Sequence, residues 1–289
     1  MPNRVRRIER LSRGVVGSNW RLTTAVTLFG KESQRMLERD ALVDWLDNLL
    51  RPEDGPIDDA SNNGLQVEGK PEVERVVGGV DACRQLFERA AAERADFVLV
   101  HHGLSWGGGL KRLTGLAAGR VRTLFAHEIS LYASHLPLDM HPKIGHNAVL
   151  ARKLDIEAPE PFFPYNGREI GFAGDLPEVM SAGKLGQRVD DLLGGSCTLV
   201  GERKAEIQRV GVVSGGGADA VSECPGAGCD CLITGEMKHS EFHTAAELGV
   251  CVIAAGHYRT EMVGVKALLE RMRAELPVES SFISLPTQL

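Results

Sequence analysis

The sequence predicts an α/β fold built as α/β/α layers. Short runs of β-branched and aromatic residues alternate with stretches of helical periodicity, which is typical of helices packed on a largely parallel sheet. Polar residues follow several of these runs directly, as they do at the ligand-binding edge of open α/β sheets. The chain has 289 residues, of which 43% are hydrophobic and 25% charged. This is ordinary for a globular protein and long enough for one large or two modest domains.

The predicted elements follow one another in the order that such a fold requires. Apolar positions between residues 42 and 50 mark a first helix that begins near Met36. Strands are predicted at residues 75–80, 97–101, 130–134, 208–213, 229–234 and 250–254. Helices are predicted at residues 82–94, 118–128, 145–154, 240–248 and 261–275, with Thr260 as a candidate N-cap for the last.

Composition divides the chain into four parts. Residues 1–35 hold eight Lys or Arg against two acids, and we interpret them as a basic extension outside the fold, or as residues upstream of a true start at Met36, in preference to an organelle-targeting segment. Residues 36–157 are expected to form a first α/β lobe and residues 204–289 a second. The Pro- and Gly-richer stretch 158–203 is expected to be a less regular junction between them.

Three predicted strand ends offer metal-ligand chemistry. His101 and His102 follow a buried strand and precede a glycine-rich loop, Asp139 lies shortly after the next strand, and His257 and Glu261 follow a third. A single strand-end histidine is more often a half-buried core residue than a ligand. Imidazole suits Zn, Fe and Ni, and carboxylate also admits Mn or Mg and can bridge two ions. Three such segments together predict a metal site.

The same segments resemble a known family. The matching stretches are Asn63–Gly69, Val100–Gly103, His135–Asp139, Ile233–Glu236, and Gly256–His257 with Glu261. In this order they are similar to the GTP cyclohydrolase 1 type 2 homologues, also described as Nif-three-like dinuclear metal proteins, over about residues 36–285. The resemblance implies two lobes that share a dinuclear site, a ring-like homohexamer, and two divalent metal ions per chain (Zn, Fe, Mn or Ni). The ligands that it implies are His101, His102, Asp139, His257 and Glu261.

Other residues near these strand ends leave alternatives open. His135 and Glu236 are candidates for orienting ligands or moving protons, against plain structural roles. His239 is a weaker partner for Glu236, and the remaining histidines (His127, His141, His146 and His243) are interpreted as surface or packing residues. The glycine run at 215–217 predicts a tight turn more strongly than an anion contact.

The chemistry then favours a hydrolase. Two divalent cations outweigh the carboxylates of Asp139 and Glu261, which suits an anionic substrate such as GTP or another nucleotide and a metal-activated water. A non-catalytic metal-binding ring that acts through protein contacts is the alternative. The net charge of −6 gives no case for nucleic-acid binding, and no apolar run approaches the roughly 20 residues of a membrane span. Six scattered cysteines are interpreted as free thiols of a cytoplasmic protein.

Overall fold

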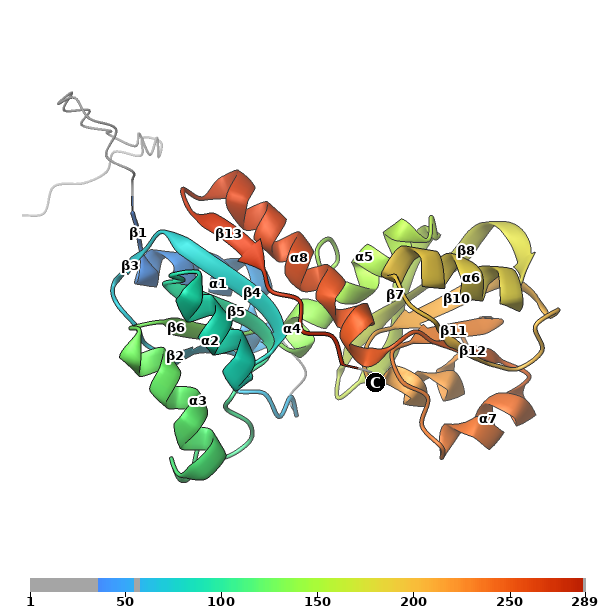
Figure 1. Ribbon diagram of the computed structural model, residues 1–289. Coiled ribbons are helices and arrows are strands. Elements are labelled where there is room, and N and C mark those ends of the chain that lie inside the picture. The colour runs from blue at the N-terminus through green and yellow to red at the C-terminus, as the bar shows by residue number, and fades with distance from the viewer. Residues whose placement is uncertain (1–35, 55–57, 288–289) are drawn as a thin grey trace, which may run out of the picture. The chain divides into compact units, whose positions relative to one another are not determined.

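The computed structural model describes residues 36–54 and 58–287 (Figure 1). The extension predicted at residues 1–35 lies outside the described residues. Arg35–Leu289 forms one compact unit. This unit contains two larger sheets with helices on both faces, which confirms the predicted α/β class.

The first sheet has five strands in the order β13-β4-β5-β6-β2. Their bounds are β2 Gly64–Val67, β4 Arg75–Asp81, β5 Phe97–His102, β6 Ser130–Ala133 and β13 Glu279–Phe282. All neighbouring pairs are parallel except β2 with β6. A separate two-stranded sheet pairs β1 (Leu37–Glu38) with β3 (Glu72–Val73). The last strand of the chain thus pairs with the first long one.

The second sheet has six strands in the order β7-β8-β10-β11-β12-β9. Their bounds are β7 Glu157–Tyr165, β8 Arg168–Ser181, β9 Thr198–Val200, β10 Glu206–Val213, β11 Cys231–Thr234 and β12 Cys251–Ala254. Only the central strands β10, β11 and β12 run parallel, so this sheet is less parallel than predicted.

The stretch 158–203, predicted to be irregular, has regular structure in most of its length. It contains most of β7, all of β8 and β9, and the helix α6 (Ala182–Leu193). Three prolines fall within β7, which is an edge strand, and an edge strand tolerates a residue that cannot donate a backbone hydrogen bond. Pro and Gly therefore misled the secondary-structure prediction here, while the predicted domain boundaries stay a prediction.

Helices cover both faces of each sheet. The remaining helices are α1 Arg39–Leu50, η1 Pro52–Asp54, α2 Arg84–Ala92, α3 Gly115–Ala126, α4 Leu136–Asp139, α5 His146–Lys153, η2 Gly217–Glu223, α7 Glu241–Leu248 and α8 His257–Glu275. Alternation along β5 shows the layering: Phe97 and Leu99 pack toward α1 and α8, whereas Val98 and Val100 pack toward α2 and α3. Around the second sheet, α5 and α6 lie on one face, with α7 and η2 on the other.

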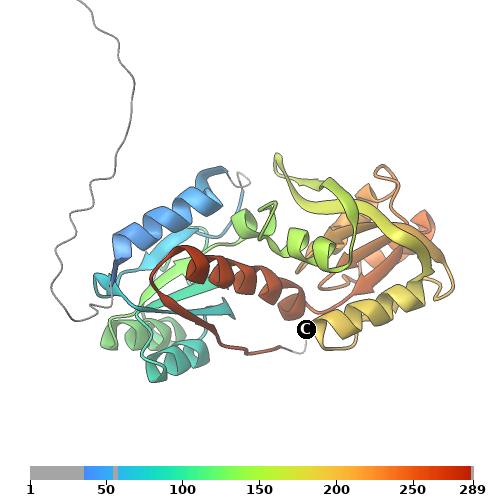
Figure 2. The ribbon, with the colours of Figure 1, turned by 90° about the horizontal axis from the view of Figure 1, so that it is seen from above.

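Helix α8 belongs to both cores. Val263, near its start, packs in the core of the second sheet, and Leu268 and Met272 pack against the first sheet. The helix is the long red one in Figures 1 and 2. The helix begins at His257 rather than after Thr260, because Gly256 is the N-cap at φ +95°, where glycine is favoured. Among the helices of the described residues, none combines the length and hydropathy that a membrane crossing requires.

Candidate metal centre

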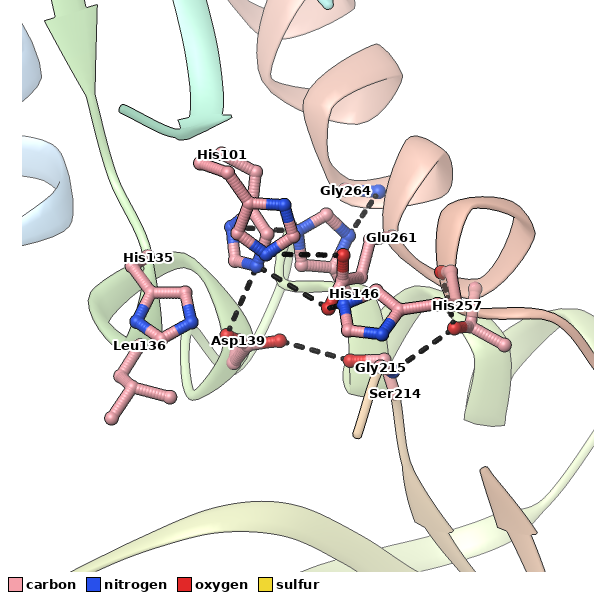
Figure 3. Close-up of polar contacts among 12 residues, drawn as sticks. His101, His135, Leu136, Asp139, His146, Ser214, Gly215, His257, Glu261 and Gly264 are labelled. Carbon is pink, nitrogen blue, oxygen red and sulfur yellow. Dashed lines mark hydrogen bonds and ion pairs between the residues drawn. The ribbon is translucent and has the colours of Figure 1, made fainter. Parts of the chain in front are cut away.

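The five predicted ligands lie near one another at the carboxyl ends of the strands. Figure 3 labels four of them, His101, Asp139, His257 and Glu261. His101 and His102 are the last residues of β5. Asp139 ends the short helix α4 that follows β6, and His257 and Glu261 lie four residues apart in the first turns of α8. A helix brings residues at i and i+4 to one face, so these two side chains point the same way. We call these five residues the donor cluster; their role as ligands stays a prediction.

Four histidines at the site hold Nδ1 against an oxygen. The contacts are His101 to the Ser134 carbonyl at 2.8 Å, His102 to Asp81 Oδ1 at 2.8 Å, His135 to Asp59 Oδ1 at 2.7 Å, and His257 to Glu236 Oε1 at 2.7 Å. A carbonyl or carboxylate oxygen only accepts, so Nδ1 carries the proton and donates it. In the neutral ring, the Nε2 lone pair is then free. Hydrogen-bonded Nδ1 and free Nε2 are the usual state of a metal-binding histidine.

The free Nε2 atoms face carboxylate oxygens at distances that suit a shared cation. His101 Nε2 lies 3.5 Å from Asp139 Oδ2 and 3.6 Å from Glu261 Oε1. His102 Nε2 lies 3.4 Å from Glu261 Oε2, and His257 Nε2 lies 3.0 Å from Glu261 Oε1. Two donors that share a tetrahedral ion at about 2.1 Å lie roughly 3.4 Å apart. The spacing fits bound metal better than direct hydrogen bonding for all but the His257 contact.

Two atoms of the donor cluster are buried without a hydrogen bond. His101 Nε2 and Glu261 Oε2 have no such partner among the described residues. An unsatisfied buried polar atom is costly, and an unpaired buried charge more so. Both atoms face the centre of the donor cluster, where a cation would satisfy them. The residues present therefore fit a metal ion.

The pKa values show the charge that the site requires. Burial lowers the pKa of His101, but the carboxylates of Asp139 and Glu261 outweigh burial and raise it to about 9. Burial likewise lowers the pKa of His257, and Glu261 and Glu236 raise it to about 9. Burial raises the pKa of Glu261, yet the nearby histidines hold it well below its usual range. The site thus favours positive charge next to Glu261.

The turn after β10 contacts the carboxylates of both Asp139 and Glu261. Ser214, just after β10, donates through Oγ to Asp139 Oδ1 at 2.9 Å. The next residue, Gly215, has φ +61°, and its backbone passes so close to Glu261 Oε1 that any Cβ would overlap it. The glycine run therefore forms a tight turn, as predicted, and the turn brings the main chain against the donor cluster.

Several residues at the site were not predicted from the sequence. Asp81 could have been found, because it ends β4 as the histidines end β5. Asp59 lies in a turn with no periodic pattern, so nothing in the sequence distinguishes it. His146, assigned to surface or packing, is fully buried; its ring lies 4.5 Å from that of His101, and burial lowers its pKa well below the usual value. His239 is exposed.

A cavity of about 320 Å³ opens next to the donor cluster. The donor-cluster residues that line it are His102, Asp139, His257 and Glu261. It is also lined by residues outside the donor cluster: His135, Leu136, Phe163, Tyr165, Ile170 and Lys238. A small molecule can thus reach the donor cluster directly.

Comparison with known proteins places this site in a family. A family model described as Duf34/NIF3 (NGG1p interacting factor 3) matches residues 37–288. The chain belongs to the NIF3 family. A "GTP cyclohydrolase 1 type 2 homolog" of Deinococcus radiodurans is 43% identical to this NIF3 protein over 251 residues, which are 87% of this chain and 94% of the relative. One from Pyrococcus abyssi is also 43% identical, over 88% of this chain and all of the relative.

Solved structures agree with the family. The crystal structure of TTHA1606 from Thermus thermophilus superposes on the NIF3 chain with a TM-score of 0.78 at 39% identity. It covers 88% of this chain, and the match spans all of that protein. A second structure, of protein ybgI, described as of unknown function, gives a TM-score of 0.81 at 33% identity. The predicted family is thereby confirmed, and the donor cluster lies within the matched region.

Proposed function

We propose that this NIF3 protein is a hydrolase that depends on two divalent metal ions and acts on a nucleotide or a related phosphate-bearing compound. The observation that carries the proposal is the convergence of the Nε2 atoms of His101, His102 and His257 on one buried carboxylate, Glu261, beside an open cavity. A purely structural role for these side chains would not leave His101 Nε2 and Glu261 Oε2 buried without a hydrogen bond.

The donor cluster divides into two sets of three. His102, His257 and Glu261 would hold one ion, as one of the groups whose donor atoms lie close enough to share a cation. His101 and Asp139 would hold the other together with Glu261, whose carboxylate lies 3.6 Å from His101 Nε2. Three protein donors per ion leave coordination positions free, as in catalytic sites. Zn, Fe, Mn and Ni all suit this donor set. When bound, such a pair acts as a Lewis acid and lowers the pKa of water to produce a nucleophile near neutral pH.

The chain's own residues would position the substrate and move protons. His135 lines the cavity, and Asp59 holds its Nδ1, so its Nε2 is the atom able to exchange a proton with a bound molecule. Asp59 is itself fixed by Asn63 and by the Ser61 backbone, and these hydrogen bonds together with His135 lower its pKa although burial raises it. Glu236 instead orients His257. Leu136 and Ile170 give the cavity an apolar wall that excludes water.

One experiment tests the function. Metal-loaded protein is incubated with GTP, GMP and other nucleotides, and products are resolved by mass spectrometry. We expect turnover of at least one nucleotide, abolished in Glu261→Gln. Glu247→Gln, an exposed carboxylate on α7, is the matched control and should retain activity. Metal-loaded protein that converts no nucleotide would contradict the proposal and favour a role through protein contacts.

We also propose that the protein is a cytoplasmic homohexamer with a small-molecule substrate and no nucleic-acid or membrane partner. All six cysteines are unpaired, which suits a reducing compartment. Apolar side chains exposed in the stretch 106–125 (Trp106, Leu110, Leu113, Leu116 and Phe125) offer a surface for self-association.

A further inference from the structure

Two aromatic side chains on the hairpin β7–β8 line the same cavity as four residues of the donor cluster. They are Phe163 and Tyr165, whose ring centroids lie 6.2 Å apart with an interplanar angle of 39°. The hairpin forms one edge of the second sheet, with β7 as the edge strand (Figure 2). Tyr165 lies at its turn and remains 38% exposed. Neither side chain belongs to the donor cluster or contacts it through a hydrogen bond.

The backbone of Phe163 adopts a strained conformation. Its φ is +65°, a left-handed value that a bulky residue rarely adopts, and the following Pro164 restricts it further. The neighbouring Phe162 already fills the apolar core, where it packs against Gly211 and is 4% exposed. Phe163 is partly buried against the same core and also lines the cavity. Strain of this kind concentrates at functional sites.

Outside the donor cluster, the charges that line the cavity give a phosphate group little attraction. Lys238 is the one Lys or Arg among the described residues that line it, and its Nζ lies 2.7 Å from Asp219 Oδ2. Asp58 and Asp59 also line the cavity. Apart from the metal ions, this wall therefore offers an anion little attraction. A volume of about 320 Å³ is near the lower end of the range for ligand pockets, which suits a compact molecule.

We propose that Phe163 and Tyr165 form the wall on which the planar ring of the substrate stacks. The substrate class is then a compact nitrogen heterocycle of about purine size, recognised by its ring, and the reacting end of the molecule faces His135 and the donor cluster. This inference rests on the proposed function only for the statement that the bound ring compound is a substrate. The stacking wall itself follows from the cavity and its two aromatic rings.

The test separates ring binding from phosphate binding. Guanosine carries the ring without phosphate, and ribose 5-phosphate carries phosphate without the ring. Binding of each to the metal-loaded full chain is measured by titration calorimetry for the unaltered protein, Phe163→Leu, Tyr165→Leu and Phe242→Leu. Phe242 is an exposed aromatic residue on α7 outside the cavity lining, so its variant is the matched control. Metal content and melting temperature verify that each variant folds.

We expect guanosine to bind roughly 5- to 150-fold more weakly to Phe163→Leu or Tyr165→Leu, the range for loss of one base–aromatic stack. Ribose 5-phosphate should bind all four proteins alike, and Phe163→Tyr should restore guanosine binding. If Phe163→Leu fails to fold, Tyr165→Leu decides, because its side chain is partly exposed.

Equal weakening of both probes, guanosine binding equal to that of Phe242→Leu, or no guanosine binding by the unaltered protein would each overturn the inference. Hydrolysis is measured separately. Ring binding without turnover would contradict the proposed function and leave the stacking wall in place. If turnover and guanosine affinity are both unchanged in Phe163→Leu and Tyr165→Leu, the stacking wall is contradicted and the proposed function is kept.

Discussion

In four histidines of the site, the acceptor of the Nδ1 hydrogen bond determines that Nε2 is the nitrogen available to a ligand. Ser134, Asp81, Asp59 and Glu236 each accept a hydrogen bond from Nδ1, so Nε2 points away from that acceptor in all four rings. Without these acceptors, each imidazole would be free to choose either tautomer and either ring orientation. The chemistry of the site therefore depends on residues that no ion would touch.

The division of the donor cluster into two sets gives a stoichiometric prediction. We expect the unaltered protein to carry about two equivalents of metal per chain. Asp139→Asn should remove one set and leave about one equivalent, His257→Gln should remove the other, and Glu261→Gln, which belongs to both, should lose nearly all metal. The readout is elemental analysis after dialysis. Full metal content in Glu261→Gln would refute the assignment.

The pKa values predict how stability depends on pH when metal is absent. His101 and His257 have pKa values raised from 6.5 to about 9, so their protonation stabilises the metal-free fold fully below pH 6.5. That contribution is lost as pH rises through about 9. Bound cations would supply the same positive charge at every pH in this range.

We therefore expect the melting temperature of chelated protein to fall between pH 6.5 and 9.5, and that of metal-loaded protein to fall much less. His257→Gln should reduce the slope, whereas His127→Gln, an exposed histidine, should leave it unchanged. Parallel curves for chelated and loaded protein would count against this account.

For single residues, the sequence predicted that the members of the donor cluster lie together, but it did not predict the residues that hydrogen-bond to them. His101, His102 and Asp139 could be predicted because strand ends gather at one edge of a sheet. Asp59 and Ser214 could not, because they reach the site through turn geometry and through the approach of the second sheet. Both depend on tertiary packing that has no local pattern.

Among the elements, the hairpin β7–β8 shows the limit of prediction from local composition. Pro159, Pro161 and Pro164 lower the strand propensity of β7, and Gly171 and Gly174 do the same for β8. Both strands form because β7 occupies an edge and β8 pairs with β10. The buried parallel strands, which are continuously apolar, were predicted within about two residues of their ends.

The turn after β10 provides a matched pair of glycine variants. Gly215→Ala would place a methyl group against Glu261 at φ +61°, a backbone state that alone costs roughly 1–2 kcal/mol for a residue with a side chain. Gly216 has φ −79° and open space around it. We expect Gly215→Ala to lose most bound metal and Gly216→Ala to retain it. Equal metal content in the two variants would show that the close approach is unimportant.

The whole molecule is built so that neither sheet completes the site alone. The first sheet and α4 carry His101, His102 and Asp139, and the start of α8 carries His257 and Glu261. The α/β layers were predictable from alternation of strands and helices. The return of β13 to the edge of the first sheet was not, because a pairing between residues 75–78 and 279–282 leaves no local signal.

Assembly is testable directly. Light scattering at micromolar concentration should give about six times the chain mass of 31.3 kDa. The exposed apolar residues at 106–125 would lie in contacts between subunits, since monomers rarely expose large apolar patches. Leu113→Glu and Leu116→Glu together should shift the mass downward. A mass of one chain for the unaltered protein would exclude the hexamer.

Because α8 lies late in the chain, the donor cluster becomes complete only late in protein synthesis. Glu261 is translated 122 residues after Asp139. At about 5–20 residues per second, this delay lasts roughly 6 to 24 s. Throughout it, the growing chain holds His101, His102 and Asp139 without the carboxylate that both sets share. On the proposed function, tight binding of two ions requires Glu261, so the metal supply once α8 has folded would decide which ions the protein keeps.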